Sequence, residues 1–477
     1  MKANTEFRSH FINNFPFEPT KDQQIAIEHL SNYIFNQKRD QVFLLKGYAG
    51  TGKTTLVSAL IKALAKTGKK SVLLAPTGRA AKVLAGYTGM RASTVHRKIY
   101  FFSGDKQGNM KITLTPNLHK NTIFIVDEAS MIPDARGNQY DSIFNRDLLS
   151  DLLEYVYFTD SCKVIFIGDT AQLPPVNLNI SPALNPEYFK DYLDYEALSF
   201  EMHQVLRQAQ GSGILSNATS LRQKLSAADI GYPFFSIGDF KDIRKVTGAD
   251  LEEHLQDYFN NRNEMDAVVI TRSNKRANLF NQEIRRRILY QEGEISEGDR
   301  LMVVKNNYYW LDGETSKAGF IANGDIIELL VILGYEELYG YRYANVRVQL
   351  VDYPEEPALD VKIMLNTVML ETPSLPYPQQ RELFNAIMED CSDSTSRKVR
   401  VDYVKASPHY NALQIKFSYA LTCHKTQGGQ WGTVFVDQGY LTDDMINEEY
   451  LRWLYTAITR ATDRVFLINF KDEFFAD

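Results

Sequence analysis

Eight residues near the start of the chain form a pattern that binds phosphates. The stretch at 47–54, GYAGTGKT, fits G-x-x-x-x-G-K-[ST] and follows the apolar run QVFLL at 41–45. Glycines let backbone N–H groups approach phosphate oxygens, and a helix expected at 53–66 presents its positive N-terminus to them. We therefore expect ATP here, with Lys53 at the β- and γ-phosphates and Thr54 as a ligand of Mg²⁺. The residues expected to bind the nucleotide are Gly47, Gly50, Thr51, Gly52, Lys53, Thr54 and Thr55.

Two further segments place polar side chains at the ends of expected strands. In IFIVDEAS, Asp127 and Glu128 follow the apolar run at 122–126. An acid at this position can hold Mg²⁺, which we assign to Asp127, while Glu128 orients the attacking water. The alternative is a solvated acidic turn, which the phosphate-binding pattern upstream disfavours. In VIFIGDTAQLPPV, Gln172 can sense the γ-phosphate or its attacking water through a hydrogen bond, although a loop ended by prolines would look similar.

The elements that position these residues read as alternating strands and helices. Short, continuous apolar runs are typical of buried parallel strands, and helical patterns between them predict a doubly wound sheet. The runs of the first set lie at 41–45, 71–75, 122–126 and 163–167, and those of the second at 267–270, 433–436 and 464–468. The sequence therefore predicts an α/β protein with two such domains, the first at 1–176 and the second at 177–299 and 409–477.

Two segments interrupt this alternation. Between 300 and 352, β-prone runs are broken by glycine and asparagine, which indicates a small barrel, while 354–408 reads as irregular. We interpret 300–408 as an insertion in the second domain. In the first domain, two β-prone arms around the turn-rich SGDKQGNM predict a hairpin at 97–118.

Composition narrows the class of protein. The 477 residues carry a net charge of −6, so a nucleic-acid partner would have to be held in a locally basic groove. Three well-separated cysteines without a C-x-x-C argue against a zinc site or a disulfide framework and suit a reducing compartment. No apolar run reaches the roughly 18–20 residues that span a bilayer, and no secretory signal is visible. We expect a cytoplasmic protein without a membrane partner.

Taken together and in order, the segments resemble the motifs of superfamily 1 helicases. GYAGTGKTT, VDEAS and GDTAQLPPV carry the resemblance, which runs from about 17 to 470. The segments STVH and HKTQG are similar to motifs of the RecD/Dda-like branch, whose members move 5′-to-3′. Further matching segments are TKDQQIA (20–26), APTGRAA (75–81), STVH (93–96), VLRQ (205–208), ALTCHKTQGGQW (420–431) and LYTAITRA (454–461). The resemblance implies two RecA-like P-loop domains.

The resemblance also implies roles for individual residues. Gln23 would recognise adenine, and Arg207 and Arg460 would reach across from the second domain as arginine fingers. Hydroxyls, amides, a lysine and rings of three segments would contact single-stranded DNA. These residues are Pro76, Thr77, Thr94, His96, His424 and Lys425. Either histidine could instead be a packed core residue. The GGQW at 428–431 departs from the family, in which an acidic residue is common at this place.

The two interruptions have counterparts in this family. The hairpin would be the pin that splits the duplex, and Phe101 or Phe102 would stack on the last base pair, unless these aromatics pack on their own domain. If the arm is a strand, the two rings point to opposite faces, so at most one meets DNA. The insertion would be an SH3-like barrel that guides DNA.

The implied activity is that of an ATP-dependent 5′-to-3′ DNA helicase that acts, as a monomer, on single-stranded DNA and duplex junctions. Two alternatives stay open, an RNA-directed superfamily 1 helicase and a DNA-stimulated ATPase that remodels nucleoprotein without unwinding. A P-loop kinase or transferase is disfavoured because a second domain carries the arginines.

Overall fold

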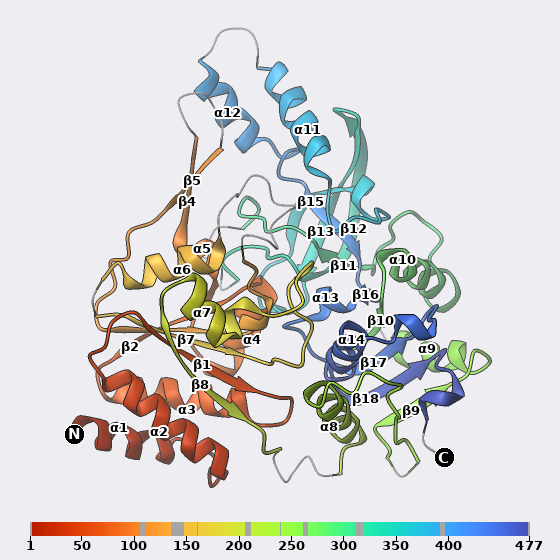
Figure 1. Ribbon diagram of the computed structural model, residues 1–477. Helices are drawn as coiled ribbons and strands as arrows, with labels where there is room; N and C mark the ends of the chain where they lie inside the picture. Colours follow the sequence, from red (N-terminus) through yellow and green to blue (C-terminus); the bar gives the residue numbers. More distant parts are fainter. Residues whose placement is uncertain are drawn as a thin grey trace.

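The computed structural model shows two α/β domains side by side, with a β-barrel and two helices above the second (Figure 1). Over the described residues, no helix is both long enough and apolar enough to cross a membrane. The described residues are 2–104, 110–134, 147–159, 161–205, 211–238, 240–260, 266–311, 316, 318–391 and 396–475.

The first domain is built on a parallel sheet with the strand order β3-β2-β6-β7-β1-β8. Its strands are β1 (Gln41–Gly47), β2 (Lys70–Ala75), β3 (Ala92–Thr94), β6 (Thr122–Val126), β7 (Lys163–Gly168) and β8 (Glu196–Met202). Side chains alternate along each strand, so both faces are apolar and both are covered. Phe43 and Leu45 pack against helices on one face, and Val42 and Leu44 against helices on the other.

Seven helices cover this sheet in the described residues. On one face lie α1 (Lys2–Asn13), α2 (Lys21–Phe35), α3 (Lys53–Lys66) and α4 (Gly78–Thr88), and on the other α5 (Val95–Ile99), α6 (Leu148–Tyr157) and α7 (Pro186–Tyr192). The helix expected at 53–66 is confirmed with the same bounds. The boundary predicted at 176 is wrong, because β8 pairs with β1 along its whole length and extends the first sheet to Met202.

The second domain has a parallel sheet of its own, with the order β16-β10-β17-β18-β9. Its strands are β9 (Ile243–Val246), β10 (Ala267–Thr271), β16 (Ala420–Thr422), β17 (Trp431–Asp437) and β18 (Ala461–Ile468). The three runs expected at 267–270, 433–436 and 464–468 are thereby confirmed as neighbours in one sheet. The helices are α8 (Gly213–Ser226), α9 (Leu251–Phe259), α10 (Asn274–Glu283), α13 (Cys423–Thr426) and α14 (Glu448–Ile458).

The insertion contains a closed five-stranded barrel, as predicted. Its strands are β11 (Arg300–Val303), β12 (Ile326–Leu338), β13 (Tyr341–Leu350), β14 (Leu359–Met364) and β15 (Leu413–Phe417). The predicted end at 408 is too early, because β15 closes the barrel against β11 and β14. The region 354–408 is also more regular than expected. It holds β14 and the helices α11 (Tyr377–Glu389) and α12 (Arg397–Ala406).

The predicted hairpin projects upward from the first domain (Figure 1). It consists of β4 (Tyr100–Gly104) and β5 (Met110–Leu114), which pair antiparallel, and most of its expected turn lies outside the described residues. Tyr100 anchors the base, because its ring is buried and its hydroxyl donates to Asp151 Oδ2 at 2.6 Å. The ring of Tyr100 is therefore part of the core of the first domain, whereas the side chain of Phe101 is 60% exposed. The side chain of Phe102 lies outside the described part of the structure.

The barrel is inserted in the second domain but also contacts the first. A Cβ on Gly78 of α4 would lie 1.9 Å from the Cβ of Ala322, so the two backbones touch and only glycine fits. Lys82, one turn later, pairs with the buried carboxylate of Asp325. These contacts tie α4, which begins in the APTGRAA segment, to the β11–β12 connection.

Candidate nucleotide site between the two domains

The phosphate-binding loop connects β1 to α3 and has the geometry that its glycines predict. Gly50 and Gly52 have φ angles of 76° and 82°, which only glycine adopts without strain. Lys53 Nζ donates to the carbonyl oxygens of Gly47 at 2.6 Å and Tyr48 at 3.0 Å. Thr54 is exposed on the first turn of α3. The loop thus brings a cation, a free helix N-terminus and an open hydroxyl together, as phosphates and a hard metal ion require.

Gln23 lies behind this loop and supports it. Its amide nitrogen donates to Thr51 O at 3.2 Å, and its Oε1 accepts from the backbone N–H of Thr20 at 3.0 Å, which closes a capping box at the start of α2. The side chain is fully buried. Recognition of adenine by Gln23 stays a prediction, and what the structure shows is a brace between α2 and the loop.

The acidic pair follows β6, as expected, and a third residue holds it in place. Tyr87 donates its hydroxyl proton to Asp127 Oδ2 at 2.6 Å, and Glu128 N donates to Asp127 Oδ1 at 2.9 Å. Burial raises the pKa of Asp127, and these two hydrogen bonds oppose that shift. Glu128 has a φ of 50°, in the left-handed region, so its backbone turns away from the strand direction. Sequence reasoning missed Tyr87, which lies on α4 far from any acidic motif.

The segment after β7 brings Asp169 and Gln172 to the same edge of the sheet. Asp169 is buried, and its Oδ2 lies 3.9 Å from Lys53 Nζ. Gln172 is also buried, and its Oε1 has no hydrogen-bond partner among the residues that the structure describes. An amide oxygen only accepts hydrogen bonds, so this unpartnered Oε1 suits a proton donor such as the attacking water rather than a γ-phosphate oxygen.

One face of α14, from the second domain, closes over this edge (Figure 1). The Tyr455 hydroxyl accepts from Ala49 N at 2.8 Å and donates to Asp169 Oδ2 at 2.6 Å. Thr456 Oγ1 accepts from Leu173 N at 2.8 Å. Arg452 Nη1 donates to the carbonyl oxygen of Thr170. The contacting positions 452, 455 and 456 are spaced by three and four residues, so they share one helix face.

Arg460 follows the same helix and approaches the acidic pair. Its Nε donates to Thr456 O at 3.2 Å and its Nη1 to Gly429 O at 3.3 Å, and the side chain is buried. Burial raises the pKa of Glu128, whereas the positive charge of Arg460 lowers it. The predicted finger therefore lies close enough to the acidic pair of the first domain for its charge to affect Glu128. Arg207, the second predicted finger, lies outside the described residues.

Comparison with known proteins agrees with this geometry. A family model described as an AAA domain matches residues 19–231, and one described as a UvrD-like helicase C-terminal domain matches residues 417–468. The ATP-dependent DNA helicase Dda of Enterobacteria phage T4 is 25% identical over 452 residues, which cover 89% of this chain and 93% of Dda. Over nearly its whole length the chain is therefore similar to helicases of the RecD/Dda-like branch of superfamily 1. The RecD2 DNA helicase of Deinococcus radiodurans is 26% identical over 475 residues, which cover 94% of this chain and 50% of RecD2.

Two solved helicase structures align with most of the chain. Pif1 from Bacteroides, in complex with ADP-AlF3 and single-stranded DNA, aligns at 16% identity and a TM-score of 0.47, and the alignment covers 97% of this chain and 95% of Pif1. Pif1 from Candida albicans aligns with 96% at 15% identity and a TM-score of 0.48.

Most residues of the first domain that are predicted to contact single-stranded DNA lie at the N-termini of helices. Thr77 and Thr94 are the N-caps of α4 and α5, where their hydroxyl oxygens accept from Ala80 N and Arg97 N, both at 3.2 Å. Pro76 precedes the first of these caps and is half-buried. Thr94 is buried, so any contact with a strand would use the exposed end of its helix. His96, on α5, packs its ring 5.9 Å from that of Tyr100.

The predicted contacts of the second domain lie on α13. His424 borders a pocket of about 220 Å³ whose lining includes Arg272 and Trp453, and burial lowers the pKa of His424. Lys425 Nζ is buried without a hydrogen-bond partner among the described residues, and burial together with the charge of Lys416 lowers its pKa to about 7. An ammonium in this state gains strongly from an anion, which is consistent with the predicted phosphate contact.

The departure at GGQW has a structural counterpart that sequence reasoning missed. The guanidinium of Arg79, in the APTGRAA segment, lies 4.2 Å from the ring centroid of Trp431. A Cβ on Gly429 would meet Arg79 Nε at 2.7 Å, so this glycine makes room for the pair. A cation–π contact thus joins the two domains at a second place.

Proposed function

We propose that this chain is an ATP-dependent DNA helicase that moves 5′-to-3′ on single-stranded DNA and unwinds duplexes. The observation that carries the proposal is the face of α14, because it brings Tyr455 and the helix end at Arg460 from one domain onto the nucleotide loop and acidic pair of the other. A kinase or transferase does not need its site to be completed in this way. A motor does, because bound ATP can then draw two domains together and hydrolysis can release them.

The residues present fit a magnesium ion with ATP. Thr54 offers an exposed hydroxyl, and within the described part of the chain each carboxylate oxygen of Asp127 accepts one hydrogen bond and keeps a second lone pair. The ion would neutralise charge on the phosphates. Lys53 would place its ammonium on the β- and γ-phosphates, Glu128 would orient the water, and Arg460 would stabilise the charge that develops on the phosphoryl group.

The DNA substrate and the direction rest on relatedness. The two relatives named above are both called DNA helicases, and STVH and HKTQG resemble segments of the 5′-to-3′ branch. The hairpin β4–β5, with its exposed Phe101, would separate the strands ahead of the motor. A nucleoprotein remodelling ATPase would share the motor, but the hairpin would have no task in it.

The test is ATP hydrolysis with and without oligodeoxythymidylate, for the wild type, Lys53→Ala and Lys66→Ala. Lys66 is the exposed last residue of the same helix, so it controls for loss of a lysine from α3. We expect DNA to stimulate hydrolysis in the wild type and in Lys66→Ala and not in Lys53→Ala. Stimulation by oligouridylate alone would favour the RNA-directed alternative, and hydrolysis that ignores both would overturn the proposal.

A further inference from the structure

Three side chains from two domains form an aromatic stack that none of the helicase motifs includes. The rings of Tyr308 and Phe320, from the insertion, are stacked with centroids 5.1 Å apart and planes 25° apart. The guanidinium of Arg97, from α5 of the first domain, lies 4.7 Å from the Phe320 centroid and 6.0 Å from that of Tyr308. Phe320 is 5% exposed, whereas Tyr308 is 49% exposed.

The chain around Tyr308 is held rigidly. Asn307 and Ile321 exchange two backbone hydrogen bonds, of 2.7 and 3.0 Å, so the next residues inward, Tyr308 and Phe320, face each other across this bridge. Asn307 also accepts from Tyr309 N and donates to Asn411 O. A surface ring fixed in this way binds a flat partner without the cost of ordering a loop.

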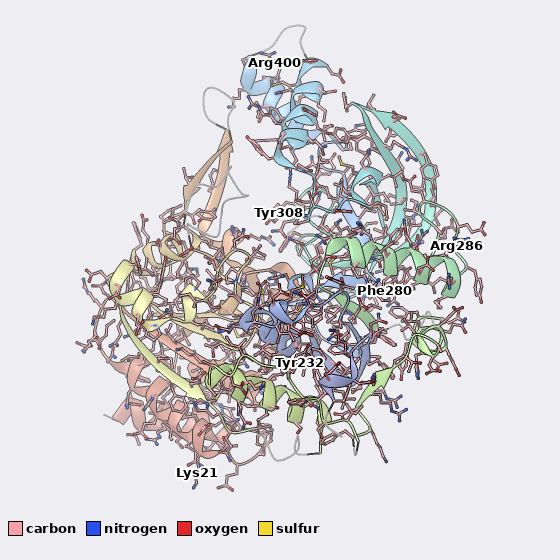
Figure 2. The ribbon with its side chains drawn as sticks, turned by 45° about the vertical axis from the view of Figure 1, so that its right-hand side comes forward. Lys21, Tyr232, Phe280, Arg286, Tyr308 and Arg400 are labelled. Carbon is pink, nitrogen blue, oxygen red and sulfur yellow. The ribbon has the colours of Figure 1, made fainter. Side chains whose placement is uncertain are left out.

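The position of the stack suits a strand of nucleic acid. Figure 2 shows Tyr308 on the inner side of the insertion, in the direction of the hairpin of the first domain. Arg97 follows His96 on α5, in the segment predicted to contact the strand. It is exposed, and no carboxylate of the described residues pairs with it. An exposed aromatic face beside a cation without an ion pair is the combination that binds a base and its phosphate.

We propose that Tyr308 is a stacking platform for a base of single-stranded DNA, with Phe320 as its support and Arg97 as the adjacent phosphate contact. This inference rests on the proposed function, because it needs DNA to pass along α5. It goes further by assigning to the barrel a direct contact with a base rather than general guidance. Stacking does not depend on base identity, so the platform would bind any sequence.

The test is binding of labelled oligodeoxythymidylate, intact or with one abasic site moved along the strand, measured by fluorescence anisotropy. In the wild type, one abasic position should weaken binding roughly tenfold, within the range known for base–aromatic stacking. Tyr308→Ala should bind the intact strand roughly tenfold more weakly and should no longer respond to that abasic position. Tyr308→Phe, which keeps the ring, should behave as the wild type.

Tyr335→Ala is the matched control, because Tyr335 is a 58% exposed tyrosine of the same barrel on the outer part of β12. It should leave affinity and the abasic response unchanged. If Tyr308→Ala keeps the wild-type response to the abasic site, or only lowers the melting temperature, Tyr308 is a packing residue and the inference is wrong. If the wild type binds no oligonucleotide at all, the proposed function itself fails.

Discussion

The hydroxyl of Tyr455 makes two hydrogen bonds between the domains, and its removal should weaken closure of the two domains on ATP. It satisfies two polar groups of the first domain at once, the N–H of Ala49 in the phosphate-binding loop and the buried carboxylate of Asp169. Tyr455→Phe removes both hydrogen bonds and leaves the ring, which is itself buried, in place. The change therefore tests the contact between domains rather than packing.

The size of the effect follows from the chemistry of the two bonds. A hydrogen bond to a charged group contributes about 1.5–3 kcal/mol and one between neutral groups about 0.5–1.5 kcal/mol. Asp169 keeps its bond from Ala171 N and its proximity to Lys53, so the loss lies toward the lower end, about 2 kcal/mol. At 1.4 kcal/mol per factor of ten, kcat for ATP hydrolysis should fall roughly 30-fold. KM for ATP should change by less than about threefold, because the contact acts on domain closure.

The assay is steady-state hydrolysis at saturating single-stranded DNA, with the melting temperature of each variant as a check on folding. Tyr450→Phe is the matched control. Tyr450 lies on the same helix and is equally buried, but its hydroxyl accepts from Gln438 within the second domain. It should keep kcat. A Tyr455→Phe variant with kcat within about twofold of the wild type, or an equal fall in Tyr450→Phe, would show that this contact does not control hydrolysis.

Three further outcomes follow from the site. Arg460→Ala should lower kcat strongly and KM for ATP little, and Arg460→Lys should not restore kcat, because one amine cannot replace bonds from Nε and Nη1. Phe101→Ala should unwind roughly 5- to 100-fold more slowly yet keep DNA-stimulated hydrolysis, since only a stacking contact is lost. DNA affinity should be constant below about pH 7 and fall as pH rises above it, because the pKa of Lys425 is lowered to about 7 in the free protein and a bound phosphate favours the charged form. Anisotropy titrations at constant ionic strength measure this fall, and Lys425→Arg should abolish it.

How far the sequence predicts this fold depends on where each element lies in its sheet. The central strands are continuous apolar runs, because both faces are covered, and all seven expected strands are confirmed. The edge strand β8 reads EALSFEM and is only partly buried, so its mixed pattern did not identify it and the first domain was ended too early. Helix α11 starts among prolines, which a first helical turn accepts. Because prolines also mark loops, the sequence pattern predicted an irregular segment there.

Some residues of the site could be predicted from the sequence and others could not. The sequence could predict roles for Lys53 and Asp127 because each of them has a fixed position within its own short motif. Contacts that depend on two segments meeting in space could not be predicted. Tyr87 donates a hydrogen bond to Asp127 from 40 residues away in the sequence, and Tyr455 donates one to Asp169 from 286 residues away. No local pattern marks either of them as part of the site.

The central claim, a motor that opens duplexes in one direction, is tested most directly by single-turnover unwinding of one labelled duplex with either a 5′ or a 3′ single-stranded tail. Lys53→Ala supplies the background without ATP hydrolysis. We predict that ATP drives opening of the 5′-tailed duplex, and that the 3′-tailed duplex stays at the level of the Lys53→Ala control. Opening of the 3′-tailed duplex at an equal or higher rate would contradict it.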